Sequence, residues 1–290
     1  MAQLDYQAPA SVDEAVKALA AAPNARVLAG GTDLIVQMRA GRAKPAMVLD
    51  LKRVPGSIGI RRESDGGFVV GAATPGAMIG EHAALVAAWP GVVEATNLIG
   101  STQVQGRASL GGNLCNASPA ADSVPAMIAA RAVCVIAGPS GRREAPVETI
   151  QAGPGRTTLG PGEFVLEFKL PPRPARASDA YLRLIPRTEM DIAVVGAGVS
   201  LALDASGTVS EAHVSLGAVA PTCLLVPPAG AALIGTKLEP AALDALDAAA
   251  QAACSPISDK RGTSEYRTKI AGVLARRAAQ IAYDRAKARA

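Results

Sequence analysis

The sequence predicts an α/β (α+β) protein made of two regions, residues 1–176 and a smaller α/β domain over residues 177–290. Helix-like and strand-like segments alternate through about residue 55, which is typical of mixed α/β folds. From about residue 56 to 176 short apolar runs alternate with Gly-rich turns, which indicates a second subdomain. The stretch Pro171–Pro174 then predicts a linker, because proline fixes its backbone dihedral angle and lacks an N–H donor.

Local signals place the elements of the first subdomain. Ser11 can cap a helix, Glu14 stands at the capping-box position, and apolar residues then recur at helical spacing. Gly41 is expected to end the next helix, because glycine readily adopts the left-handed conformation found there. In order, we expect a helix over 11–21, a strand over 26–29, a helix from Thr32 or Asp33 to Gly41, and a strand over 46–51.

The later elements follow from periodicity and turn residues. A turn at Asp204–Gly207 separates two apolar runs that resemble neighbouring strands. Gly196 and Gly198 imitate a dinucleotide-binding motif, but Leu201 replaces its third glycine, so we interpret them as part of a packed strand. We expect strands over Phe68–Gly71, Phe164–Leu170, Ile192–Leu203 and Thr208–Ala218, a helix-like segment over Gly76–Trp89, and helices over 240–253 and 264–288.

Composition argues against a nucleic-acid-binding protein. The chain is 49% hydrophobic and 19% charged, but only 3% aromatic, which leaves few side chains for base stacking. The net charge of +4 comes from basic residues spread along the sequence rather than from one run. The one basic concentration lies near the C-terminus and is interpreted as the solvated face of a helix: Arg276, Arg277, Arg285, Lys287 and Arg289.

Metal chemistry is not expected in this chain. Its cysteines, Cys115, Cys134, Cys223 and Cys254, contain no CxxC pair and no spacing typical of a zinc or iron–sulfur site. The two histidines, at positions 82 and 213, are too far apart in sequence to suggest a metal pair. Any metal would then belong to another chain.

The sequence also predicts a cytoplasmic protein. The first residues, from Met1 to Tyr6, lack the basic and apolar segments of an export signal. The longest apolar stretch, Ile192–Leu203, is shorter than the roughly 20 residues that cross a bilayer. We therefore expect no membrane span.

A first candidate binding loop, Ala29–Asp33, lies between a predicted strand and a predicted helix. Gly30 and Gly31 allow a close approach of the backbone to a ligand, and free N–H groups at a helix start favour a phosphate. Asp33 would repel a phosphate, so it either caps the helix or accepts a hydrogen bond from a hydroxyl group. The alternative for the whole loop is a simple turn.

A second candidate loop, Ser109–Asp122, concentrates glycines, asparagines, serines and a final aspartate. These groups suit a ribityl chain and a pyrophosphate, with Asp122 accepting from a hydroxyl. Two structural alternatives remain: a turn cluster that bonds only its own backbone, and an Asp122 that only caps the following helix.

These two loops, in this order and about 80 residues apart, resemble the FAD-binding fold of molybdenum hydroxylase flavoproteins, of the xanthine dehydrogenase and carbon monoxide dehydrogenase type. The resemblance implies a two-subdomain FAD-binding region of the molybdopterin dehydrogenase type. It assigns to FAD contact Ala29, Gly30, Gly31, Thr32, Asp33, Leu34, Ser109, Gly111, Gly112, Asn113, Asn116 and Asp122.

The resemblance extends over nearly the whole chain. Met190–Ala193 and Ser264–Arg267 match the C-terminal domain of these subunits. Glu163–Val165 matches the strand whose aliphatic residue touches the flavin, which implies that Val165 is a contact. Arg183 falls where many relatives carry a basic residue beside the isoalloxazine ring. That residue is commonly Lys, so Arg183 is a departure whose planar guanidinium needs a different geometry.

The family resemblance implies a medium subunit that binds FAD non-covalently and supplies no catalytic residue of its own. The molybdenum cofactor would lie in a large partner and two [2Fe–2S] clusters in a small partner, in a dimer of heterotrimers. Electrons would pass from the clusters through FAD to an external acceptor. Two other functions are weighed against this one: a free-standing flavin oxidase, and a scaffold subunit with an empty cofactor cleft.

Overall fold

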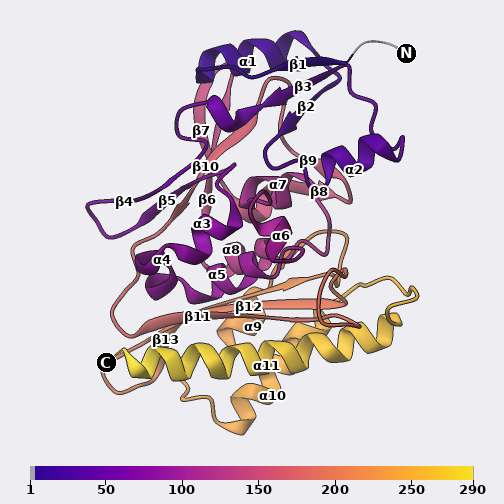
Figure 1. The fold of residues 1–290 in the computed structure, drawn as a ribbon. Coiled ribbons are helices and arrows are strands. Elements are labelled where there is room, and N and C mark those ends of the chain that lie inside the picture. Colours follow the sequence, from indigo (N-terminus) through magenta and orange to yellow (C-terminus); the bar gives the residue numbers. More distant parts are fainter. Residues whose placement is uncertain (1–3, 290) are drawn as a thin grey trace.

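Three larger β-sheets follow one another along the computed structural model, which describes residues 4–289, and residues 151–157 add a two-stranded sheet (Figure 1). The N-terminal sheet lies at one end, the long C-terminal helix lies at the other, and short helices fill the middle. Residues 1–3, part of the segment without the features of an export signal, lie outside the described residues.

The first subdomain is a three-stranded parallel sheet in the order β1-β3-β2. Ser11 Oγ accepts from the Glu14 N–H at 3.2 Å, and the Glu14 carboxylate accepts from the Ala10 N–H at 2.9 Å, which confirms the predicted capping. Gly41 follows the second helix with φ +70°, as its role as a helix end requires. The elements are β1 Asp5–Gln7, α1 Val12–Ala21, β2 Ala25–Leu28, α2 Leu34–Arg39 and β3 Met47–Asp50.

The second subdomain is a five-stranded antiparallel sheet in the order β4-β5-β10-β6-β7, covered by short helices. Phe68, Ile136 and Phe168 are among the buried side chains of its core. The elements are β4 Ile60–Arg62, β5 Phe68–Gly71, α3 Gly76–Glu81, α4 Ala83–Ala88, α5 Pro90–Asn97, α6 Thr102–Gln105, α7 Leu110–Cys115, α8 Ser123–Ala129, β6 Val133–Gly138, β7 Gly141–Pro146, β8 Gln151–Gly153, β9 Arg156–Thr157 and β10 Phe164–Leu170.

Two expectations for this subdomain are wrong. The segment Gly76–Trp89 is not one helix, because His82 has a non-helical backbone and its ring Nδ1 accepts from the Leu85 N–H at 3.1 Å, which caps a new helix. The stretch Ser109–Asp122 is not wholly a loop either. Ser109 caps the short helix α7, which occupies residues 110–115.

The C-terminal sheet, in the order β11-β12-β13-β14, lies between helices α5 and α8 on one side and α11 on the other (Figure 1). The neighbouring strands predicted around the turn at 204–207 are confirmed as antiparallel, although the first begins at Val195 rather than Ile192. The elements are β11 Ala177–Leu184, β12 Val195–Leu203, β13 Val209–Gly217, β14 Leu224–Leu225, α9 Pro227–Ala231, α10 Pro240–Ala252 and α11 Ser264–Ala288.

The end of α11 holds the C-terminal sheet against the second subdomain. Arg289 Nη1 donates to the carbonyl oxygens of Ala177 at 2.8 Å and Ala88 at 3.4 Å, the latter at the end of α4. Arg285 donates to the Asp179 carbonyl at 3.0 Å and pairs with Glu94. The interpretation of this basic group as a solvated face is therefore wrong for these two arginines, whose partners lie far away in the sequence.

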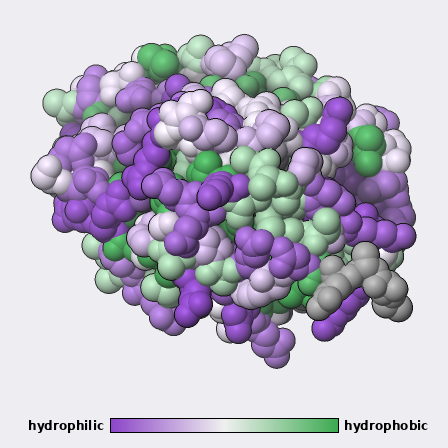
Figure 2. Space-filling model, turned by 90° about the horizontal axis from the view of Figure 1, so that it is seen from above, coloured by the Kyte–Doolittle hydropathy of each residue, from purple (hydrophilic) through white to green (hydrophobic). Residues whose placement is uncertain are grey.

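The surface seen from above mixes hydrophilic and hydrophobic residues (Figure 2). Hydrophobic side chains reach this face in small patches that hydrophilic residues separate. Over residues 4–289, no helix combines the length and the hydrophobicity needed to cross a bilayer.

Candidate functional site

A cavity of about 540 Å³ lies where the two Gly-Gly segments meet, a volume typical of small-molecule and cofactor sites. Both subdomains supply its walls, and residues 157–163 close one side. All but two of the contact residues expected from the sequence line it: Ala29, Gly30, Gly31, Thr32, Asp33, Leu34, Ser109, Gly111, Gly112, Asn113, Asn116 and Val165. The two exceptions are Asp122 and Arg183.

The first loop lies directly against the segment that precedes the second. A Cβ added to Gly30 would stand 1.8 Å from the Arg107 carbonyl oxygen, so no side chain fits there. Among the described residues, the backbone N–H groups of Gly31, Thr32 and Asp33 donate to no protein acceptor. The three residues line the cavity, and free backbone donors of this kind suit the oxygens of a phosphate group.

Asp33 does not cap α2, so the first of its two predicted roles is wrong. It stands at the N-cap position, but its side chain forms no capping hydrogen bond. Partial removal from water raises the pKa of its carboxyl group. The carboxylate therefore remains available to accept from a ligand hydroxyl.

The two glycines of the second Gly-Gly pair have different surroundings. The Gly111 N–H donates to the Ala72 carbonyl at 2.9 Å, and a Cβ on Gly111 would stand 2.5 Å from that oxygen. Around Gly112, by contrast, an added Cβ would meet only Ser109 Oγ, at 3.3 Å. Both glycines line the cavity, but Gly111 also packs against Ala72, whereas Gly112 has open space beside it.

Both asparagines of the second segment have protein partners on their carbonyl side. Asn113 Oδ1 accepts from the Ser123 N–H at 3.1 Å and from Ser123 Oγ at 2.7 Å. Asn116 Oδ1 accepts from Gln37 Nε2 at 2.9 Å. The amide nitrogens of Asn113 and Asn116 are then the groups left to donate to a ligand.

Several residues that line the cavity were not among the predicted contacts, and Gln37 and Ile99 are two of them. Gln37 lies on α2, four residues after Asp33 and therefore on the same helix face, and this spacing could have indicated it. Ile99 lines the cavity from the turn after α5, and no sequence signal distinguishes it from other apolar residues.

Asp122 and Arg183 contact each other instead of lining the cavity. Arg183 Nη1 lies 2.9 Å from Asp122 Oδ2, and the two side chains are 5% and 12% exposed. Tyr181 also donates to Asp122, at 3.4 Å. Burial raises the pKa of Asp122 to about 6, although the Arg183 charge opposes this shift. The side chain makes no capping hydrogen bond to α8, so the simple helix-cap alternative is wrong.

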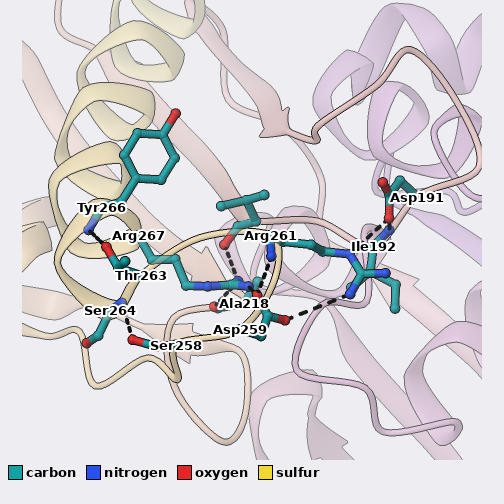
Figure 3. Close-up of polar contacts among 11 residues, drawn as sticks. Asp191, Ile192, Ala218, Ser258, Asp259, Arg261, Thr263, Ser264, Tyr266 and Arg267 are labelled. Carbon is teal, nitrogen blue, oxygen red and sulfur yellow. Dashed lines mark hydrogen bonds and ion pairs between the residues drawn. The ribbon is translucent and has the colours of Figure 1, made fainter.

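The two C-terminal motifs come together in one polar network (Figure 3). Asp191, from the first motif, accepts from Arg261 Nε at 2.9 Å. Arg267, from the second, pairs with Asp259 at 2.7 Å and donates to the Val194 carbonyl at 2.7 Å. This network fixes the chain between β11 and β12 against the start of α11.

The same arginine is linked to the second loop through one residue, Ala218. Arg267 Nη1 lies 3.5 Å from the Ala218 carbonyl oxygen, and the Ala218 N–H donates to the Pro119 carbonyl at 2.7 Å. Cys223 Sγ also donates to Pro119, at 3.4 Å. The C-terminal region therefore supports the segment between α7 and α8.

These features fit FAD. The cavity joins free backbone donors and two amide donors, which suit the pyrophosphate, with a carboxylate for a hydroxyl and an apolar wall at Val165. Among the described residues there is no group of three or more His, Cys, Asp or Glu side chains that could hold a metal ion. The donor set is compatible with a nucleotide cofactor such as FAD.

Family comparisons agree with this chemistry. Residues 2–173 match the FAD binding domain in molybdopterin dehydrogenase, and residues 180–282 match the CO dehydrogenase flavoprotein C-terminal domain. The carbon monoxide dehydrogenase medium chain of Afipia carboxidovorans is 36% identical over 284 residues, 98% of each chain. A putative xanthine dehydrogenase FAD-binding subunit of Escherichia coli is 29% identical, over 91% of each chain.

A solved structure extends the likeness to the fold. Reconstituted CO dehydrogenase from Oligotropha carboxidovorans contains a chain that superimposes with a TM-score of 0.92 at 36% identity, covering 99% of both chains. The expected two-subdomain FAD-binding fold with a C-terminal domain is thereby confirmed. The chain belongs to the FAD-binding medium subunits of the molybdenum hydroxylases, oxidoreductases of the carbon monoxide dehydrogenase and xanthine dehydrogenase type.

Proposed function

We propose that this subunit binds one FAD non-covalently in the cavity between its two Gly-Gly segments. The observation that carries the proposal is the convergence there of Gly31 and Gly112, from two subdomains, around free donors. FAD, when bound, supplies the redox chemistry that transfers electrons from the [2Fe–2S] clusters of a partner to an external acceptor. The protein's own task is to bind the cofactor, orient it and keep it accessible to that partner.

The first loop is proposed to hold the pyrophosphate. The N–H groups of Gly31, Thr32 and Asp33 would donate to phosphate oxygens, and the Asp33 carboxylate would accept from a sugar hydroxyl. Ala29, Gly30 and Leu34 would form the surrounding wall.

The second segment is proposed to hold the ribityl chain and the adjoining phosphate. Ser109 and Gly111 shape the segment, and Gly112 leaves room for the ligand. Asn113 and Asn116 would donate through their amide nitrogens.

Three further contacts are proposed near the flavin ring. Val165 offers an apolar wall to the ring. Asp122 is next to Ser123, which binds the cavity-lining Asn113, and this neighbourhood supports a contact of its carboxylate with a ribityl hydroxyl. Arg183, its ion-pair partner, would then place a cation beside the ring and favour negative charge on the reduced cofactor.

The assembly is proposed to contain a large molybdenum-cofactor subunit and a small [2Fe–2S] subunit, arranged as a dimer of heterotrimers in the cytoplasm. The relatives' description as medium chains supports partners of both sizes. Within this chain, residues 1–176 would form the FAD-binding domain, with subdomains at about 1–55 and 56–176, and residues 177–290 the C-terminal domain. The separate sheets of the three segments support this division.

Two measurements test the proposal. The purified chain should be yellow, and acid precipitation should release its flavin into the supernatant. A colourless chain that takes up no added FAD would refute the binding site, and flavin retained in the pellet would refute non-covalent attachment.

A second experiment separates this subunit from a free-standing oxidase. Candidate substrates are added anaerobically to the chain alone and to the chain co-expressed with its partners, and the visible absorbance of the flavin is followed. We expect bleaching only with the partners. Rapid bleaching of the lone chain would favour the oxidase.

A further inference from the structure

Gln37 reaches across the cavity from α2 to the end of α7, where its Nε2 donates to Asn116 Oδ1 at 2.9 Å. The two residues are 79 positions apart and belong to different subdomains. We propose that Gln37 is a positioning residue, which sets the spacing of the two Gly-Gly segments and turns the Asn116 amide nitrogen toward FAD. This inference rests on the proposed FAD site.

Backbone hydrogen bonds fix the main chain at Gln37. Its N–H donates to the Asp33 carbonyl at 2.9 Å. Its carbonyl oxygen accepts from Arg42 at 2.9 Å and Ala43 at 3.2 Å, which closes the turn after α2. The Cα of Gln37 is therefore held in α2 and the turn after it, so only the side-chain torsions remain to be ordered when the amide binds Asn116.

The hydrogen bond supplies a second point of contact between the two segments. The first is the packing of Gly30 against the Arg107 carbonyl. One contact alone would let α2 pivot about Gly30, whereas two contacts fix both ends of the loop. The spacing of the pyrophosphate donors relative to the second segment then depends on Gln37.

In the observed bond the Gln37 amide donates and the Asn116 oxygen accepts, which leaves the Asn116 amide nitrogen free among the residues that the structure describes. The orientation of the Asn113 amide is fixed without Gln37. The Ser123 backbone N–H can only donate, so the Asn113 oxygen must face it. Asn116 is held by another amide, and either end of an amide can pair. A glutamate at position 37 can only accept, so it would draw the Asn116 nitrogen away and leave its oxygen facing the cofactor's phosphates.

The test is a double-mutant cycle on FAD affinity. Gln37→Met keeps the length of the side chain, Gln37→Glu reverses the amide, and Asn116→Ala removes the donor. Apoprotein of each variant is titrated with FAD, binding is followed by flavin fluorescence, and the melting temperature of each apoprotein is recorded. Gln280→Met is the matched control, because Gln280 also bonds a side chain, Asp284, at 3.1 Å, but on the exposed face of α11.

We expect Gln37→Met to weaken FAD binding about fivefold, the effect of one neutral hydrogen bond. Gln37→Glu should weaken FAD binding further. The carboxylate adds a negative charge near the phosphates, and the reversed Asn116 amide turns its oxygen toward them. Asn116→Ala in the Gln37→Met background should weaken binding much less than in the wild type, because the two residues act as one unit. The control should bind FAD like the wild type.

Three results would overturn the inference: additive effects of Gln37→Met and Asn116→Ala, wild-type affinity in Gln37→Glu, or lower melting temperatures with unchanged FAD affinity. The last would show a purely structural hydrogen bond. These outcomes differ from failure of the proposed function, in which the wild-type chain itself would bind no FAD.

Discussion

Replacing Asp122 by asparagine should remove a pH dependence from the stability of this chain. Burial raises the pKa of Asp122 from 3.8 to about 6, even with Arg183 beside it. The folded state therefore binds this proton more tightly than the unfolded state. The stabilisation is fully present below pH 3.8 and is lost as the pH rises through about 6.

The size of the effect follows from the two pKa values. Over the whole range, the shift corresponds to about 3 kcal/mol. Between pH 5 and pH 8 the contribution of Asp122 should fall by about 1.4 kcal/mol. The rest is already lost below pH 5, because Asp122 in the unfolded chain ionises at lower pH than in the folded chain. An asparagine does not titrate, and it leaves Arg183 with an amide oxygen to bind at either pH.

The assay is urea unfolding of the wild type and of Asp122→Asn at pH 5 and pH 8, at constant ionic strength. The unfolding free energy of the wild type minus that of the variant should be about 1.4 kcal/mol lower at pH 8 than at pH 5. Circular dichroism at both pH values checks that the variant is folded. A difference that stays constant, or that grows with pH, would refute the assignment of a raised pKa to this buried carboxyl group.

Two further substitutions test the loop packing and the C-terminal network. Gly30→Ala would place a Cβ 1.8 Å from the Arg107 oxygen, so we expect the purified chain to retain little FAD. The measurement is the ratio of flavin to protein, and a normal ratio would show that the loop can move to accept the Cβ. Arg267→Met, at a side chain only 4% exposed, removes charge-assisted bonds to Val194 and Asp259 and should lower the unfolding free energy by about 3 kcal/mol in urea. Arg261→Met is the control and should cost less, because its side chain is 20% exposed. Equal losses in the two variants would contradict this role of Arg267.

Local patterns were sufficient to predict much of the fold. The cap at Ser11, the strand Phe68–Gly71 and the helix starting at Ser264 lie where the sequence indicates them, because each depends on neighbouring residues. The break at His82 could not be predicted, since apolar periodicity continues through it, although the His82 backbone is non-helical and its ring caps the second helix at Leu85.

The candidate site was predictable where it depends on short segments. The Gly-Gly segments are recognisable because glycine allows close backbone approach, and both line the cavity. Pairings across the fold were not predictable. Asp122 and Arg183 are 61 residues apart, and nothing in either sequence neighbourhood indicates that their side chains form an ion pair.

The hydrogen bond of Arg289 to a residue far away in the sequence also bears on how the chain folds during synthesis. Ala88, at the end of α4, is synthesised 201 residues before Arg289 bonds to it. At about 5–20 residues per second, this interval is about 10–40 s, whereas small domains fold within about a second or less. The nascent FAD-binding region therefore has time to fold while the surface that later receives the C-terminal sheet and the end of α11 is still uncovered. During this interval the surface is open to chaperones or to other nascent chains, so slower translation of the last third of the message should increase aggregation.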